Sequence, residues 1–223
     1  MDILSVTFTE SGNEACVRTD QGFFDITRAD LSEFLREFFG EDVKDALAPG
    51  CENDFFPLYA KDEAASSLEF LSQKLKAIKY AVYLLGINDK SEKQLLQKLK
   101  TKGYPKPVCN AAFAVLKKNG YLCDERSCKR KCELLANGKL FGERRIITEL
   151  LAKGYSYELC HRVVDEADID FEENLSALFE KISGHKYLSD REQKKKIYDK
   201  LLRYGYSYDE VRDLFERLLA DEY

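Results

Sequence analysis

The sequence has few of the residues that mark exported, membrane-spanning or catalytic proteins. It contains two histidines, four prolines and one methionine, and no apolar run near the roughly 20 residues that cross a bilayer. No basic stretch followed by a hydrophobic run stands after Met1, so we expect no signal peptide, no membrane contact and a cytoplasmic location. The seven cysteines do not form the dense framework of a secreted disulfide domain.

The composition indicates a folded and mainly helical protein. Hydrophobic residues make up 44% of the chain, with 13 Tyr and 14 Phe, which excludes a fully disordered chain. Only four Pro and 12 Gly occur beside 34% charged residues, a balance typical of helices. Nothing in the sequence demands a dimer, so we expect a monomer.

Motifs for common enzyme classes are missing. The sequence has no phosphate-binding loop, no dinucleotide fingerprint, no zinc-protease motif and no nucleophile elbow. His161 follows Cys160 directly, but neighbouring residues on a helix point about 100° apart, so a Cys–His pair is disfavoured. His185 stands beside Gly184 and is expected in a loop. We therefore expect no catalytic site and no cofactor.

Four cysteines in the middle of the chain could serve as zinc ligands or as packing residues. Structural zinc sites favour cysteines separated by two to four residues. Here the separations are 13, 4 and 3 residues, and we expect the last two cysteines on one helix face, where they pack as small apolar residues. Packing is the favoured interpretation, with no metal. The four residues are Cys109, Cys123, Cys128 and Cys132.

The net charge of −5 hides a strong asymmetry along the chain. Residues 1–73 carry 5 basic and 16 acidic side chains, residues 74–153 carry 19 and 7, and residues 154–223 carry 11 and 17. A basic block between two acidic ones predicts a surface that binds either the phosphate backbone of a nucleic acid or an acidic protein partner. The sequence does not separate these two alternatives.

The first region differs from the rest of the chain. Residues 3–8, 14–19 and 22–26 are short, rich in β-branched and aromatic residues, and separated by turn signals, which predicts an antiparallel meander. An amphipathic helix is expected over 27–39. From Lys61 onward no strand is expected.

An internal repeat organises the remaining chain. Gly-Tyr pairs recur every 51 residues, at Gly103, Gly154 and Gly205, with apolar residues at fixed offsets such as Leu95, Leu99 and Leu150. Each Gly is expected to close a helix in a left-handed conformation, with the following Tyr packed on the last turn. Ser91, Ser156 and Ser207 fit the caps of helices.

These offsets predict tandem three-helix repeats that form an elongated, curved array, because no single unit buries much alone. The expected helices are 74–86, 91–102 and 107–119, then 124–137, 142–153 and 157–167, then 171–183, 190–204 and 208–220. The expected domains are a β-meander and helix region at 1–73 and repeats at 74–122, 123–169 and 170–223.

The basic block supplies the candidates for contact with DNA or a protein partner, although a solvated charged face would need no partner. The candidates are Lys90, Lys93, Lys98, Lys100, Lys102, Arg126, Lys129, Arg130, Lys131, Arg144 and Arg145. Most aromatic residues fall at packing positions, but Tyr157 and Tyr208 stand one residue into a helix and are weaker contact candidates.

Three stretches of the sequence have the form of family motifs. They are Lys90-Ser-Glu92 through Lys102-Gly-Tyr104, the segment ending at Asp124, and Gly142 to Leu150. These stretches resemble the patterns of the RecX family of regulators of the RecA recombinase, and the chain is similar to a divergent member with a β-rich extension. The motif positions, expected to be structural, are Ser91, Glu92, Leu95, Leu99, Gly103, Tyr104, Gly120, Asp124, Gly154 and Gly205.

The resemblance implies a non-enzymatic regulator. RecX proteins bind the RecA filament on single-stranded DNA and inhibit its recombinase, ATPase and coprotease activities, which modulates DNA repair and the SOS response. The basic block would then face DNA or acidic filament surfaces, and the acidic ends would face basic patches. The alternatives are an autonomous nucleic-acid-binding protein without a recombinase partner and an enzyme that uses the cysteines.

Overall fold

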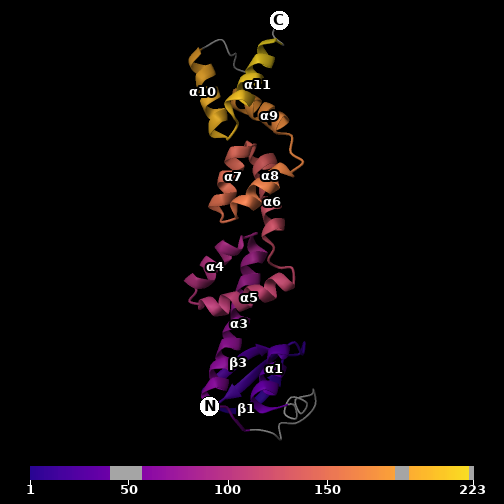
Figure 1. The fold of residues 1–223 in the computed structure, drawn as a ribbon, viewed down its shortest axis with the longest axis vertical. Helices are drawn as coiled ribbons and strands as arrows, with labels where there is room; N and C mark the ends of the chain where they lie inside the picture. Colours follow the sequence, from indigo (N-terminus) through magenta and orange to yellow (C-terminus); the bar gives the residue numbers. More distant parts are fainter. Residues whose placement is uncertain (41–56, 184–190, 221–223) are drawn as a thin grey trace. The chain divides into compact units, whose positions relative to one another are not determined.

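A computed structural model describes residues 1–40, 57–183 and 191–220 of the chain (Figure 1). These residues form two compact units. The N-terminal unit comprises residues 1–87 and 96–121, and the C-terminal unit comprises residues 88–95 and 122–223. Residues 88–95, which lie before and at the start of the second helix of the first repeat, therefore pack with the C-terminal unit.

The N-terminal unit begins with the predicted meander. Strands β1 (Asp2–Phe8), β2 (Glu14–Thr19) and β3 (Gly22–Thr27) pair antiparallel in chain order. A fourth strand, β4 (Leu58–Tyr59), pairs with the outer edge of β1, giving the order β3-β2-β1-β4. The sequence did not predict β4, because two residues are too few to show an alternating pattern.

Helix α1 (Arg28–Phe39) is the helix predicted over 27–39, and it packs against this sheet. Its first turn is capped by the hydroxyl of Thr27, which accepts from the Asp30 amide at 3.1 Å. Leu31, Phe34 and Leu35 are buried, and they join the core that the inward side chains of the strands form. The amphipathic pattern over 27–39 therefore located this helix correctly.

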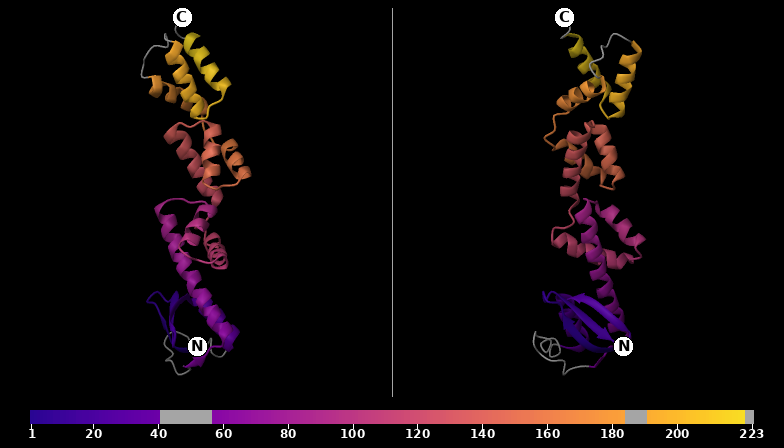
Figure 2. Two further views of the ribbon diagram at one scale, coloured as in Figure 1. Left: turned by 90° about the vertical axis from the view of Figure 1, so that its left-hand side faces the viewer. Right: turned by 180° about the vertical axis from the view of Figure 1, so that it is seen from behind.

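Helix α3 (Asp62–Ile87) corrects one prediction. Its expected start at 74 is wrong, because the helix begins 12 residues earlier. The first half buries Ala64 and Leu68 in the sheet core, and the second half packs with a helix of the first repeat. Figures 1 and 2 show α3 leading out of the sheet region as one continuous helix. The boundary drawn after residue 73 therefore falls inside a helix.

The other helices of the first repeat are α4 (Glu92–Thr101) and α5 (Lys106–Lys118). The end of α4 has the predicted geometry: the Gly103 amide donates to the Lys100 carbonyl at 2.9 Å, and the Tyr104 amide donates to the Leu99 carbonyl at 3.1 Å. These two bonds define a Schellman stop. Helix α5 packs on α3 through an apolar stripe that includes Ala112 and Phe113.

The C-terminal unit contains the second and third repeats. Helices α6 (Asp124–Lys139), α7 (Glu143–Ala152) and α8 (Tyr157–Asp165) surround one core cluster. Helices α9 (Phe171–Ser183), α10 (Arg191–Arg203) and α11 (Tyr208–Ala220) surround another. The fold class is therefore as predicted: three-helix repeats that follow a small β-meander and a helix. The curvature of the array stays a prediction.

The tyrosines after the helix-closing glycines belong to these cores. Tyr155 is 5% exposed, and its hydroxyl bonds to that of Ser127 at 3.1 Å. Tyr206 is 1% exposed and donates to the Leu140 carbonyl at 3.2 Å. Each ring thus fills a core while its hydroxyl forms a hydrogen bond, so these two tyrosines are packing residues.

Candidate nucleic-acid and partner interface

The motif serine Ser91 forms a junction with the second repeat. Its side chain is fully buried, and its hydroxyl donates to the Lys153 carbonyl at the end of α7, at 2.6 Å. The same oxygen accepts from the Gln94 amide at 3.2 Å, which caps the start of α4. Beside it, the Glu92 amide donates to the Asp124 carboxylate at 2.8 Å. Motif residues therefore connect α4 with the second repeat.

The same junction recurs 51 residues later. The Gly142 amide at the start of α7 donates to the Tyr204 carbonyl at the end of α10, at 2.9 Å. The guanidinium of Arg145 adds a bond to the Arg203 carbonyl at 2.9 Å. In both junctions the positive N-terminal end of a helix meets the negative C-terminal end of the equivalent helix in the following repeat, which is electrostatically favourable.

The repeated glycines permit this close approach. Gly205 has a φ of +99°, and a Cβ atom there would lie 2.5 Å from the Arg145 amide nitrogen. Gly154 has a φ of +90°, and its Cβ would lie 2.9 Å from the side chain of Lys93. By contrast, a Cβ on Gly103 would meet no atom of the described residues within 4 Å. The close approach therefore requires glycine at 154 and 205, and a structural role for the other motif positions stays a prediction.

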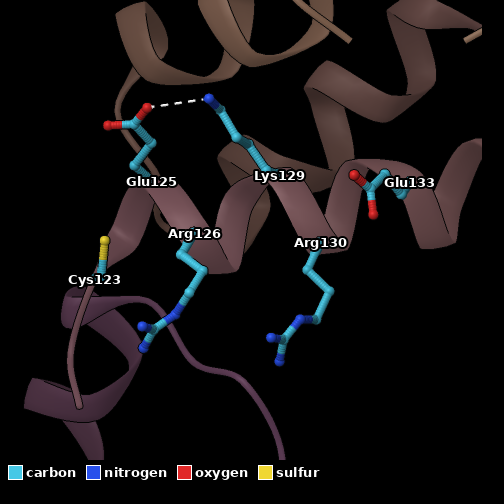
Figure 3. A pocket seen from close by; sticks show the side chains of 6 residues that line it. All are labelled: Cys123, Glu125, Arg126, Lys129, Arg130 and Glu133. Carbon is cyan, nitrogen blue, oxygen red and sulfur yellow. Dashed lines mark ion pairs between the residues drawn. The ribbon is translucent and has the colours of Figure 1, made fainter. Parts of the chain in front are cut away.

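Most basic candidates of the C-terminal unit already have partners. Lys129 forms ion pairs with Glu125 at 3.2 Å and Glu166 at 3.6 Å, and Arg130 pairs with Asp89 at 2.9 Å. Figure 3 shows Arg126 and Arg130 extending from one side of α6 and Lys129 from another. Their charge is partly balanced within the unit, so it attracts phosphates less strongly.

These α6 residues border an open hollow of about 410 Å³. Two carboxylates share the hollow with three cations and one exposed thiol, so it has mixed charge. The lining residues are Cys123, Glu125, Arg126, Lys129, Arg130 and Glu133 (Figure 3). Mixed charge favours a polar protein surface over a polyanion at this place.

The remaining candidates of this unit have different surroundings. The guanidinium of Arg145 lies 4.1 Å from the ring centroid of Phe141, and the stem of Lys93 contacts Gly154, so both belong to the junctions. Lys90 donates to the Asn88 carbonyl at 3.2 Å. Arg144 is exposed and Lys131 is half-buried, and neither forms an ion pair with a described residue.

The N-terminal unit holds further candidates without ion pairs. Residues 74–87 and 96–121 contain nine lysines and no aspartate or glutamate. Lys74 and Lys79 pair with Asp30 and Glu14 of the sheet region, each at 2.6 Å. Within the described ranges no ion pair is formed by the exposed side chains of Lys98, Lys100, Lys102 and Lys106. We call these two stretches the acid-free segments.

An aromatic surface accompanies these lysines and was missed by the sequence analysis. Tyr80 and Tyr83 on α3 have ring centroids 6.5 Å apart and an interplanar angle of 21°. Tyr83 is 64% exposed, and the ammonium of Lys102 lies 5.7 Å from the Tyr80 ring. Aromatics at helical spacing are usually core residues, so no local signal distinguishes these two.

The two weaker aromatic candidates are also exposed. Tyr157 is 61% exposed, and its ring lies 4.2 Å from that of His161. Tyr208 is 65% exposed and lies 6.1 Å from the ring of Tyr198. His161 therefore contacts an aromatic ring on the surface of α8. His185 lies outside the described residues.

The cysteines of α6 and α8 form a buried thiol cluster. Cys128, Cys132 and Cys160 are fully buried in the core of the second repeat. Burial raises the pKa of Cys128 to about 12 and that of Cys132 to about 11, so both are neutral thiols. Among the described residues, no group of three or more His, Cys, Asp or Glu side chains is arranged to hold a metal.

Comparison with known proteins identifies the chain's relatives. Residues 77–114 match the model of the first three-helix domain of RecX, and residues 168–215 match that of the third. The regulatory protein RecX of Vibrio vulnificus is 33% identical over 134 residues, which cover 59% of this chain and 86% of that protein. This chain belongs to the RecX family.

Solved RecX structures share its fold. A crystal structure of regulatory protein RecX superposes with a TM-score of 0.69 at 15% identity, covering 95% of this chain and 98% of the other. The RecX structure from Lactobacillus salivarius gives 0.59 at 20% identity, covering 66% and 96%. No helix among the described residues is long and apolar enough to cross a membrane.

Proposed function

We propose that this RecX-family protein binds the RecA recombinase filament on single-stranded DNA and inhibits its recombinase, ATPase and coprotease activities. Inhibition of this kind would modulate DNA repair and the SOS response. The protein would act as a regulator without catalysis or a cofactor, as a monomer in the cytoplasm. Relatives with the name "Regulatory protein RecX" support the regulatory part of this proposal.

The observation that carries the proposal is the combination of family membership with the acid-free segments. These segments contain nine lysines and no carboxylate of their own, and four exposed lysines form no ion pair within the described ranges. Such unbalanced positive charge attracts nucleic-acid phosphates through counterion release. A filament that carries single-stranded DNA offers these phosphates together with protein surface. The mixed charges on α6 suit the protein part of such a partner.

The acidic N-terminal region has an internal role that limits its part in binding. Asp30 pairs with Lys74 where both side chains are at most 15% exposed, and Glu14 pairs with Lys79. These pairs connect the sheet region to α3. We therefore assign partner contacts first to the lysines and second to the acidic surface.

ATP hydrolysis by the cognate recombinase tests the proposal. Hydrolysis is stimulated by single-stranded DNA, and substoichiometric protein should suppress it if the protein acts on filaments. Unchanged hydrolysis at a stoichiometric amount would reject the proposal. Bovine serum albumin at the same concentration controls for nonspecific inhibition.

The unpaired lysines favour one other candidate, an autonomous nucleic-acid-binding protein without a recombinase partner. Such a protein would bind naked DNA with a steep salt dependence and would affect hydrolysis only by sequestering DNA. Raising the DNA concentration separates the two functions. Extra DNA would relieve sequestration, whereas inhibition through the filament would persist.

A further inference from the structure

Helix α3 presents one exposed stripe whose composition differs from the rest of the helix. Lys76, Tyr80, Tyr83 and Ile87 are spaced by four, three and four residues, so they lie on one face. Tyr83 and Ile87 are each 64% exposed, while Ala77, Ala81 and Leu84, on another face of the helix, are buried. A soluble protein gains nothing in folding from two large exposed apolar side chains.

The two tyrosine rings of this stripe are arranged as a platform. Their planes differ by only 21°, with the centroids 6.5 Å apart, and Lys102 lies over the Tyr80 ring. Tyr104 lies near Tyr80. The pKa of Tyr104 is raised, mainly by burial and to a lesser degree by the neighbouring Tyr80. The inner ring of Tyr80 is half-buried, while the outer ring of Tyr83 stays open to solvent.

The charge around the platform indicates its occupant. The stripe and Lys102 belong to the acid-free segments, and Lys102 forms no ion pair with a described residue, so its ammonium can receive an incoming anion. An acidic peptide would use the lysines but not a flat ring face. A strand of unpaired nucleotides uses both, because each nucleotide carries one phosphate and one base with a π-face.

We propose that Tyr83 and Tyr80 form a stacking site for the bases of single-stranded nucleic acid, with Lys102 contacting the adjacent phosphate. A base would stack on the exposed face of Tyr83, and Ile87 would cover its edge. The site depends on unpaired bases, since bases inside a duplex have no free face. This inference deepens the proposed function, on which it rests, because it names residues that would contact the DNA strand directly.

Binding of a 15-nucleotide thymidine oligomer to the purified full chain tests the site in the absence of any recombinase. We expect Tyr83→Leu to weaken binding about 5- to 100-fold in fluorescence anisotropy, the range measured for loss of one stacked base. An abasic oligomer of equal length should bind the wild type and Tyr83→Leu alike. The matched control is Tyr59→Leu, since Tyr59 is 72% exposed in the same unit and lies outside the acid-free segments.

The chain lacks tryptophan, which offers an independent readout. A Tyr83→Trp variant carries one indole at the proposed site, and stacking of a thymine should quench its fluorescence on addition of the oligomer. A Tyr59→Trp variant should show no quenching. The signal reports ring contact directly, so it separates stacking from a general loss of affinity.

Three results would overturn the site. They are wild-type affinity of Tyr83→Leu for the thymidine oligomer, an equal loss for the abasic oligomer, or no quenching of Tyr83→Trp. If Tyr83→Leu loses inhibition of the recombinase yet keeps DNA affinity, the stripe faces protein and the proposal is wrong. If wild type binds the oligomer through Tyr83 but leaves recombinase hydrolysis unchanged, the stacking site stands and the proposed function fails.

Discussion

Gly142 and Gly205 approach so closely that a Cβ atom on Gly142 would lie 2.6 Å from the carbonyl carbon of Gly205. The backbones themselves meet here, and the Gly142 amide donates to the neighbouring Tyr204 carbonyl at 2.9 Å. Ser91 holds the equivalent place in the preceding junction and reaches Lys153 through its hydroxyl. The two junctions therefore use one arrangement with two different donors.

Substitution of Gly205 by alanine should disrupt the second junction. Gly205 and Gly103 share a φ of +99°, but only Gly205 has a neighbouring backbone where the Cβ would lie. We expect Gly103→Ala to cost about 1–2 kcal/mol from backbone strain, and Gly205→Ala to cost about 1–3 kcal/mol more from overpacking. Urea unfolding followed by circular dichroism measures both. Equal destabilisation would contradict the close contact.

Removal of the Ser91 hydroxyl should cost more than removal of an ordinary helix cap. Ser91→Ala loses the cap and leaves the Lys153 carbonyl without this donor, so we expect a loss of about 2–3 kcal/mol. Ser156→Ala is the matched control, because exposed Ser156 only caps α8 through the Leu159 amide, at about 1 kcal/mol. The difference in free energy of unfolding reports the junction bond.

Charge reversal should separate the contribution of the lysines without ion pairs from that of Arg130, which already has a carboxylate partner. Reversal of Lys98, Lys102, Arg130 and Arg144 together is expected to weaken filament binding. We expect Lys98→Glu with Lys102→Glu to account for most of that loss, since Arg130 already pairs with Asp89. Inhibition of recombinase ATP hydrolysis measures each pair of substitutions. Full inhibition by the fourfold variant would refute the role of the basic block.

Alkaline pH should destabilise the second repeat through its buried thiols. The pKa of Cys128 is raised from 9.0 to about 12, so the folded state holds a proton that the unfolded state releases. The stabilisation is complete below pH 9 and is lost as the pH rises toward 12, with a slope of about 1.4 kcal/mol per pH unit for one proton. The unfolding temperature, measured at intervals between about pH 8 and about pH 11, should fall as this stabilisation is lost.

Alanine variants test the assignment to the thiols. Cys128→Ala should reduce the fall of the unfolding temperature above pH 9, because it removes one of the titrating thiols, and Cys128→Ala with Cys132→Ala should reduce it further. Cys123→Ala should leave the slope unchanged, since Cys123 is exposed. A slope that persists in the double variant would assign the effect to other groups, such as Tyr155 and Tyr206, whose pKa values burial also raises.

Local chemistry made much of the fold predictable. The glycines at 103, 154 and 205 predict where three helices end. A Schellman stop depends on one residue with positive φ and on an apolar contact a few positions away, and both can be read from the local sequence. The start of α3 was missed because burial of Ala64 and Leu68 against the sheet overrides the weak propensity of Ser66 and Ser67.

The interface was less predictable because its features depend on distant parts of the chain. Ser91 and Lys153 are 62 positions apart, and the acceptor is a carbonyl that leaves no trace in the sequence. Lys102 and Arg130 look alike in composition, yet only Arg130 has a carboxylate beside it in the described residues. Pairing of this kind is a tertiary property, so counts of charge could not separate the two.

The junction bonds end on backbone carbonyls, so they do not depend on the side chain of the acceptor residue. Lys153 and Tyr204 differ in size, charge and polarity, yet each presents the same acceptor to the preceding repeat. The side chain at the acceptor position can therefore be exchanged without loss of the bond, as long as the glycine that follows it is kept.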